Sequence, residues 1–118
     1  MEHFGVIDLG SNSVRLTVTK IEDDGTTQKI IAEKEPVRLS ENMGPEKTLK
    51  QPAIDRTLEA LERFRGLYKD LSNLKLKAVA TAATRMATNQ KEFLKLVKKE
   101  ADIELDVITG AWKLTIII

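Results

Sequence analysis

Alternating hydrophobic and polar positions in the first forty residues predict three consecutive β-strands. Residues 4–9 form a short apolar run, and apolar and polar residues alternate through residues 14–22. Asp23-Asp24-Gly25 is a turn signal between strands, because Asp and Gly accept the positive φ that tight hairpins require. The third predicted strand covers residues 28–39, is long enough to contain a bulge, and has Pro36 at an edge or a bend. The pattern is typical of an antiparallel meander.

Helical spacing replaces this alternation in the middle of the chain. Residues 40–51 read as a loop, and Pro52 suits the first turn of a helix. From Ile54 to Leu71 the apolar residues recur every three or four positions, which predicts an amphipathic helix. Ser72-Asn73 is expected to end this helix.

The last third of the chain predicts a strand, a helix and a strand. Residues 76–83 are small and apolar, which favours a central parallel strand that is buried on both faces. Asn89 and Glu92 resemble a capping box at the start of a second helix. Residues 103–108 read as a fifth strand, which Gly110 ends. The order β-β-β-α-β-α-β predicts an α/β layer with a mixed five-stranded sheet.

Composition narrows the functional classes. At 118 residues the chain fits one small domain, and the absence of Cys excludes a disulfide framework and thiolate metal sites. The net charge of +1 gives no overall attraction to nucleic acid or to membranes. Glu2 and Asp8 interrupt the apolar start, so we expect no signal peptide, no membrane span and a cytoplasmic location.

Residues that could bind a phosphate or a cation lie at the end of the first predicted strand. Asp8 ends the apolar run, and the small polar residues Gly10 to Ser13 follow it. Backbone N–H groups in such a turn can converge on a phosphate oxygen, and a neighbouring carboxylate can hold a divalent cation. An isolated Asp after a strand is more often a turn former, and Gly10 has turn geometry as its simplest explanation. His3, alone near the terminus, is expected to face solvent.

Two arginines are further candidates for contacts with an anion. Arg85 is predicted at the carboxyl end of the strand of small residues, where ligands bind in open α/β sheets. A guanidinium there can bind phosphate oxygens through two parallel hydrogen bonds. For Arg15, the sequence favours two interpretations about equally: a solvent-facing strand residue and a residue of the site. Arg38 and Glu41 are weaker candidates for the same edge.

Four ordered segments resemble motifs of the exopolyphosphatase and guanosine pentaphosphate phosphatase (Ppx/GppA) family. They are Asp8–Leu16, Val37–Gly44, Ala78–Arg85 and Ile103–Gly110. The resemblance covers residues 3–110 and implies a ribonuclease H-like fold of the actin, Hsp70 and sugar-kinase superfamily. In that family the active site lies in a cleft between two similar domains. Residues 1–110 resemble the N-terminal part of the first domain.

The resemblance also implies roles for particular residues. It assigns Asp8 to Mg²⁺, and it assigns phosphate binding to the following residues: Gly10, Ser11, Asn12, Ser13, Arg15 and Arg85. The implied substrates are polyphosphate or guanosine pentaphosphate, and the implied reaction is hydrolysis of a terminal phosphoanhydride bond.

The chain departs from the family after Gly110. The family has acidic residues soon after this position, one of which is the Glu that activates water, but residues 111–118 contain no carboxylate. No catalytic residue is therefore assigned, and we expect a truncated fragment that is inactive or nearly so alone. The hydrophobic tail 111–118 does not resemble the family. It favours self-association as a homo-oligomer, through a sheet edge or the tail itself.

Two other functions remain as alternatives. The chain could be a non-catalytic module that binds polyphosphate, a guanosine alarmone or a partner protein. It could also be a relative of the sugar or acetate kinases of the same superfamily. The turn Ser11-Asn12-Ser13 and the run from Ala80 to Arg85 argue against the kinase alternative.

Overall fold

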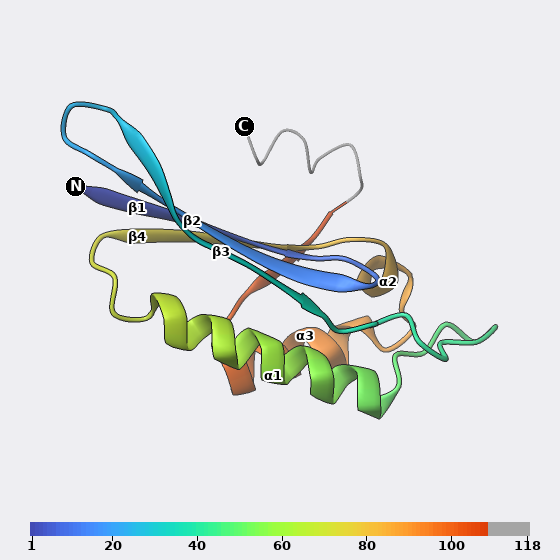
Figure 1. Cartoon of the computed structure of the whole chain (residues 1–118). Coiled ribbons are helices and arrows are strands. Elements are labelled where there is room, and N and C mark those ends of the chain that lie inside the picture. The colour runs from blue at the N-terminus through green and yellow to red at the C-terminus, as the bar shows by residue number, and fades with distance from the viewer. Residues whose placement is uncertain (109–118) are drawn as a thin grey trace.

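A five-stranded mixed sheet with two long helices on one face forms the body of the molecule (Figure 1). The computed structural model describes residues 1–108. The elements in chain order are β1 (Glu2–Leu9), β2 (Ser13–Ile21), β3 (Thr27–Pro36), α1 (Gln51–Tyr68), β4 (Leu74–Ala80), α2 (Ala82–Met86), α3 (Gln90–Ala101) and β5 (Leu105–Val107). The strands lie in the order β3-β2-β1-β4-β5. The expected fold class is thereby confirmed.

The pairing of the strands follows the predicted meander and crossovers. β1 and β2 are antiparallel, as are β2 and β3, and the β2–β3 register shifts between Val18 and Thr19. That shift is the bulge that the length of the third predicted strand indicated. β4 is parallel to both β1 and β5. The strand of small residues is therefore central and parallel, as its composition predicted.

The core lies between the sheet and the helices. Alternate residues of β1 and β2 are fully buried on this side, and the helices contribute two phenylalanines, Phe64 and Phe93. Each buried side chain of this size contributes roughly 1.5–3 kcal/mol by leaving water. The intervening residues of β1, among them Val6 and Asp8, are only partly buried. The same alternation that builds the core therefore turns Asp8 toward the sheet face opposite the helices.

The fourth strand ends earlier than the sequence predicted. β4 stops at Ala80, and α2 begins at Ala82, with the Arg85 N–H donating to Thr81 O at 2.8 Å. Alanine has the highest helix propensity, so a run of small residues suits a helical turn as well as a buried strand. Arg85 consequently lies on a short helix and not on the strand itself.

The third strand and the first helix also end before their predicted limits. β3 stops at Pro36, although Val37 and Leu39 are fully buried and continue the alternation. Pro36 lacks an N–H for the ladder, and Arg38 has a φ of 47°, which no strand contains. α1 carries Pro52 in its first turn, as predicted, but ends at Tyr68.

Two smaller predictions were wrong. Asn89 is the N-cap residue of α3, but its side chain makes no cap and instead bonds both backbone groups of Leu49, at 3.0 and 3.1 Å. His3 is only 5% exposed, with Nδ1 2.7 Å from Ser72 O, so it does not face solvent. β1 begins at Glu2, before the predicted start at residue 4, so the burial of alternate strand residues includes position 3. The predictions for Gly110 and for the tail concern residues outside the described range.

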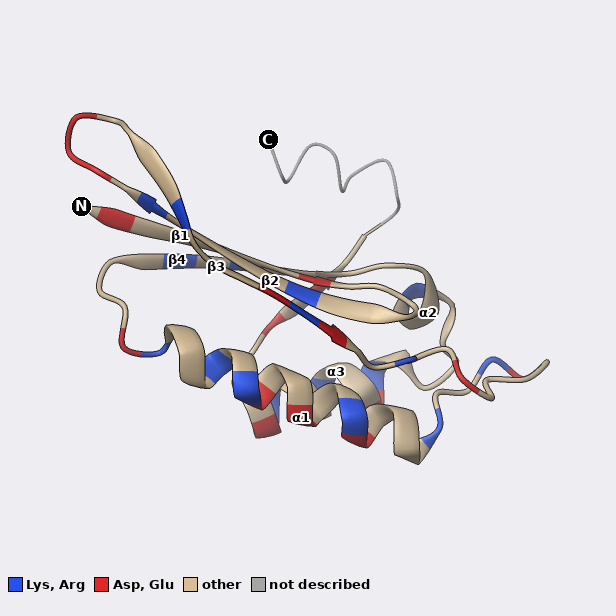
Figure 2. Ribbon diagram, in the orientation of Figure 1, with Lys and Arg blue, Asp and Glu red and all other residues tan. Residues whose placement is uncertain are grey.

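Charges of both signs are mixed along the described surface. Arg side chains are interspersed with Asp and Glu along α1 (Figure 2), as expected for a net charge near zero. Within residues 1–108, no helix has both the length and the hydrophobicity required to cross a bilayer.

Candidate phosphate-binding site

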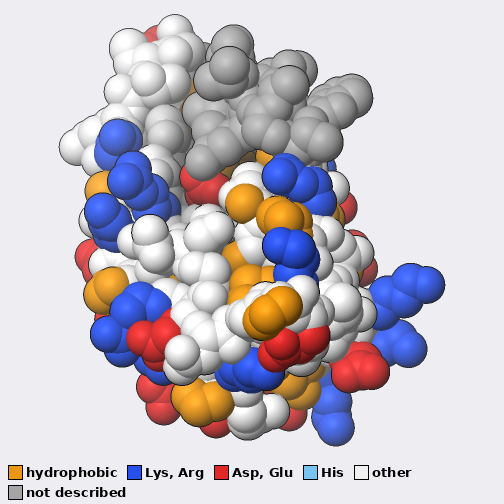
Figure 3. All heavy atoms as spheres, turned by 90° about the vertical axis from the view of Figure 1, so that its right-hand side faces the viewer, with side chains coloured by type: hydrophobic (Ala, Val, Ile, Leu, Met, Phe, Trp, Pro, Cys, Tyr) orange, Lys and Arg blue, Asp and Glu red, His pale blue; other side chains and the backbone are white. Residues whose placement is uncertain are grey.

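The β1–β2 turn lies at the edge of the sheet where two parallel strands end. β1 and β4 run parallel and both end here, and the Thr81 N–H donates to Leu9 O at 3.1 Å. Ligands of open α/β sheets bind at this kind of edge. Figure 3 views this end of the molecule, where uncharged surface lies between groups of Lys and Arg side chains.

The turn directs its backbone carbonyls away from the edge. Asn12 O accepts hydrogen bonds from the N–H groups of Val37 and Arg38, each at 2.9 Å, and Ser11 O accepts from Ser40 N at 3.1 Å. Within residues 1–108, Gly10 N–H donates to Ser13 O at 2.9 Å, whereas the Ser11 and Asn12 N–H groups donate to no backbone carbonyl. A turn whose carbonyls are occupied in this way, and whose N–H groups are not all used by the backbone, is locally electropositive. Its backbone therefore suits an anion.

A hollow of about 280 Å³ opens beside this turn. It is lined by Asp8, Gly10, Ser13 and Arg15. Asp8 and Arg15 lie directly opposite each other on β1 and β2, so their side chains share one face of the sheet. Asp8 is partly buried, whereas Arg15 is exposed. A carboxylate, a guanidinium and backbone donors thus surround one small space, a combination that suits a phosphate and its counter-cation.

Gly10 is not required by the shape of the turn. Its φ is outside the left-handed region, and a Cβ there would lie 3.5 Å from Ser13 O, an ordinary contact. Turn geometry, the simplest explanation of this glycine from the sequence, is therefore not what the structure demands. Because Gly10 lines the hollow, a side chain at this position would take space from a ligand.

The structure brings together some of the predicted site residues and separates others. Asp8, Gly10, Ser13 and Arg15 line the hollow, and the hollow is not lined by Ser11, Asn12 or Arg85. The set of residues to which the sequence assigned phosphate binding is thus divided. Ser11 and Asn12 belong to the turn backbone, whereas the guanidinium of Arg85 lies 3.4 Å from Ile108 O, at the end of β5. Arg15 is solvent-exposed and also lines the hollow, and its role in phosphate binding stays a prediction.

The donor set at Asp8 fits Mg²⁺ more closely than a transition metal. The described residues contain no group of three or more His, Cys, Asp or Glu side chains that could hold a metal. Mg²⁺ is commonly bound by one or two carboxylates together with water and substrate phosphates. Asp8, which lines the hollow together with Ser13, could supply such a carboxylate.

Sequence reasoning assigned no role to Arg56, which holds the segment behind the turn. Its guanidinium donates to the backbone oxygens of Val37 and Arg38. An arginine beside the apolar stripe of an amphipathic helix has no distinguishing signal in the sequence. Only the tertiary structure reveals that this side chain contacts residues 15 to 19 positions away.

Comparison with solved structures first defines the class of the fold. The chain superposes on RuvC of T. thermophilus with a TM-score of 0.51 at 10% identity, and on MamK with a TM-score of 0.52 at 12% identity. At these identities only the fold is shared, and it is the ribonuclease H-like and actin-like fold. The strand order and the helices on the sheet agree with that class.

The particular family follows from more similar proteins. The model of the Ppx/GppA phosphatase family matches residues 17–113, and the chain belongs to this family. The Ppx/GppA protein of Aquifex aeolicus has a TM-score of 0.86 at 34% identity, over 92% of this chain and 35% of that one. An exopolyphosphatase from Cytophaga hutchinsonii has 0.86 at 31%, over 93% and 35%.

Curated relatives agree with this assignment. A bifunctional 3-dehydroquinate synthase/phosphatase of Fusobacterium nucleatum is 36% identical over 110 residues, which cover 88% of this chain and 17% of the relative. A guanosine-5'-triphosphate,3'-diphosphate pyrophosphatase of Aeromonas hydrophila is 32% identical, covering 91% and 21%. The chain thus spans about a fifth of these relatives and about a third of the solved structures.

Proposed function

We propose that this chain is the phosphate-binding N-terminal portion of a phosphoanhydride hydrolase of the Ppx/GppA type. One observation carries the proposal: the β1–β2 turn has its carbonyls bound from behind and faces a hollow that Asp8 and Arg15 line. Fixed donors of this kind stabilise charge on a phosphoryl group without reorganising. Membership of a phosphatase family supports the same chemistry.

The proposed ligand is a chain of phosphates, as in polyphosphate or guanosine pentaphosphate. Relatives described as an exopolyphosphatase and a guanosine-5'-triphosphate,3'-diphosphate pyrophosphatase support this choice. In the proposal, Ser13 binds the terminal phosphate, Gly10 leaves space for it because it has no side chain, and Arg15 neutralises its charge. Asp8 would hold Mg²⁺, which supplies further neutralisation of the phosphate oxygens when bound.

We further propose that the chain binds this ligand without appreciable turnover. The hollow is lined by one carboxylate, Asp8, which the proposal assigns to the metal. Activation of water requires a second group that accepts a proton. A sensitive assay of phosphate release from polyphosphate tests this, and sustained release by the purified chain would contradict it.

Binding itself is tested by titrating the isotope-labelled chain with tripolyphosphate, with and without Mg²⁺, and following amide resonances. We expect the largest shifts at Gly10 to Ser13. Gly10→Ala should weaken binding about tenfold, equivalent to 1.4 kcal/mol, because the methyl group takes ligand space. Gly66→Ala is the matched control, since a Cβ at Gly66 meets nothing within 4 Å. Equal affinities of the two variants would contradict the proposed site.

The alternative is a non-catalytic module that binds a polyphosphate or a partner protein. Tripolyphosphate binding with no phosphate release by a longer natural form of the protein would favour the module. Self-association is a separate proposal, for which β3 and β5 are the two edges of the described sheet. Size-exclusion chromatography over a hundredfold range of concentration tests it, and a monomer throughout would refute it.

A further inference from the structure

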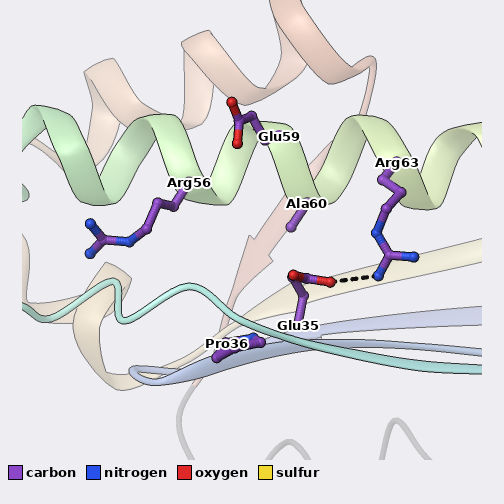
Figure 4. Close-up of a pocket in the computed structure, with 6 residues that line it drawn as sticks. All are labelled: Glu35, Pro36, Arg56, Glu59, Ala60 and Arg63. Atoms are coloured by element: carbon purple, nitrogen blue, oxygen red, sulfur yellow. Dashed lines mark hydrogen bonds and ion pairs between the residues drawn. The ribbon is translucent and has the colours of Figure 1, made fainter.

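A short segment lies between helix α1 and the β1–β2 turn. We call residues 37–41 the bracing segment; its Val37 and Leu39 side chains are fully buried. On one side, Arg56 Nε of α1 donates to Val37 O at 2.9 Å and Arg56 Nη2 donates to Arg38 O at 3.2 Å. Figure 4 shows the Arg56 side chain reaching from α1 toward the chain that follows Pro36. Arg56 thus fixes the carbonyls of the bracing segment.

The other side of the bracing segment holds the turn. The Val37 and Arg38 N–H groups both donate to Asn12 O, and Ser40 N–H donates to Ser11 O. The carbonyl of Val37 and the N–H of Arg38 belong to one planar peptide group. That single group therefore accepts from Arg56 and donates to Asn12.

The chain of hydrogen bonds ends at the peptide group of Ser13, a residue of the candidate site. Asn12 O and the Ser13 N–H also belong to one trans peptide group, so the N–H points away from the bracing segment when the oxygen points toward it. Ser13 lines the hollow. Successive hydrogen bonds polarise one another, and here the first donor carries a positive charge. The Ser13 N–H is thereby held pointing away from the bracing segment and is made a stronger donor.

We propose that Arg56 is a positioning residue for phosphate binding, acting through the peptide groups 37–38 and 12–13 on the Ser13 N–H. The inference rests on the proposed function and names a residue that does not itself line the hollow. The left-handed φ of Arg38, 47°, supports it, because a non-glycine residue holds that conformation only when its surroundings impose it. Glu41 accepts from Arg56 Nη2 at 3.0 Å and keeps the guanidinium in this orientation.

A second arginine of α1 provides a matched control. Arg63 pairs with Glu33 at 3.1 Å and Glu35 at 2.7 Å of β3, and Figure 4 shows it beside Glu35, away from the bracing segment. Arg56 and Arg63 line the same shallow pocket between α1 and the end of β3. Arg56→Gln and Arg63→Gln remove the same charge from the same helix, but only the first removes donors to the bracing segment.

The experiment compares the full chain with Arg56→Gln, Arg56→Lys and Arg63→Gln. Tripolyphosphate with Mg²⁺ is titrated against each, and hydrogen exchange is measured at the Val37, Arg38 and Ser40 amides without ligand. We expect Arg56→Gln to weaken binding about tenfold and to speed exchange at Arg38 about tenfold or more, and Arg63→Gln to change either less than about twofold. Lysine keeps the charge but lacks the planar fork, so Arg56→Lys should restore binding only in part.

The outcomes separate this inference from the proposed function. Equal binding and equal Arg38 exchange in Arg56→Gln and Arg63→Gln would overturn the role of Arg56. If the unmodified chain binds no tripolyphosphate while Arg56→Gln still releases the Arg38 amide and shifts the Ser13 resonance, the proposed function fails, and only the coupling of Arg56 to the β1–β2 turn stands. Should Arg56→Gln not fold, Arg56→Lys decides by the same two criteria, because it retains the charge that α1 needs beside Glu41.

Discussion

The two hairpin turns at the ends of β2 differ in the hydrogen bonds that stabilise them. The β2–β3 turn bonds to itself: Glu22 N–H donates to Thr26 O at 2.8 Å, Gly25 N–H donates to Glu22 O at 2.9 Å, and Asp24 accepts from Thr26. The β1–β2 turn has one such local bond, from Gly10 N–H to Ser13 O at 2.9 Å, and its other carbonyls accept from a distant segment. One turn is a closed local unit, whereas the other is completed by residues more than twenty positions away.

Their charges differ as well. The β2–β3 turn carries acidic side chains at its tip (Figure 2), and residues 9–14 of the other connection carry none. Acidic side chains repel an anion and compete for exposed N–H groups. The β2–β3 turn thus closes on itself through its own donors, whereas the β1–β2 turn is held mainly by the bracing segment, which is the arrangement that the proposed anion site requires.

The largest effect should follow from lengthening each turn. Insertion of Gly-Ser-Gly-Ser between Ser11 and Asn12 should lower the free energy of unfolding by about 2–4 kcal/mol, because it disrupts three hydrogen bonds to the bracing segment, each contributing about 1 kcal/mol. The same insertion between Asp24 and Gly25 should cost about 1 kcal/mol or less, because the bonds between Asp24 and Thr26 that it disrupts are exposed, water can replace them, and flexible surface loops lengthen at small entropic cost. Urea denaturation of both variants measures the difference. Similar losses in the two variants would show that the β1–β2 turn is not braced.

Much of this contrast could not be predicted from the sequence. Alternation and helical spacing identified all five strands and both long helices, because those patterns reflect which face of an element meets the core. The same reasoning extended the third strand to residue 39 by following buried Val37 and Leu39, although Pro36 and the backbone of Arg38 had already ended it. A buried alternation that continues beyond the end of a strand thus does not by itself extend the hydrogen-bonded ladder.

The candidate site was predicted in part for a related reason. Asp8, Gly10, Ser13 and Arg15 come together because they flank one turn and one strand pair, which are local in sequence. The predicted position of Arg85 depended on where β4 ends. In the structure Arg85 lies on helix α2 and its guanidinium contacts Ile108 O. Arg56 and Asn89 act through long-range hydrogen bonds to the backbone. Such contacts depend on how the loop 37–50 is arranged in space, and no periodicity encodes them.

A smaller effect should distinguish the glycines of the two turns. Gly25 has a φ of 90°, and a Cβ at this position would meet nothing within 4 Å, so Gly25→Ala should cost about 1–2 kcal/mol through backbone strain alone. Gly10→Ala should change the free energy of unfolding by less than about 0.5 kcal/mol, because its φ is ordinary. Thermal or urea unfolding gives both values. A larger loss at Gly10 than at Gly25 would mean that Gly10 serves the fold and not a ligand.

The smallest expected effect is the response of the β2–β3 turn to acid. The hydrogen bonds from the Thr26 hydroxyl and N–H lower the pKa of Asp24, and the N-terminal ammonium lowers the pKa of Asp23. Because both pKa values are lower in the folded chain than the ordinary 3.8, the two carboxylates stabilise the fold above that pH. This contribution is lost as the pH falls through the lowered values.

The double variant Asp23→Asn/Asp24→Asn should therefore be slightly less stable than the parent chain at pH 6 and indistinguishable from it near pH 2. Thermal unfolding midpoints between these limits measure the difference. Thr26→Ala removes one of the two hydrogen bonds to Asp24 and should reproduce part of the loss. A difference that persists unchanged to pH 2 would mean that the carboxylates act through turn shape and not through charge. In that case the contrast between the two turns would rest on hydrogen-bond pattern alone.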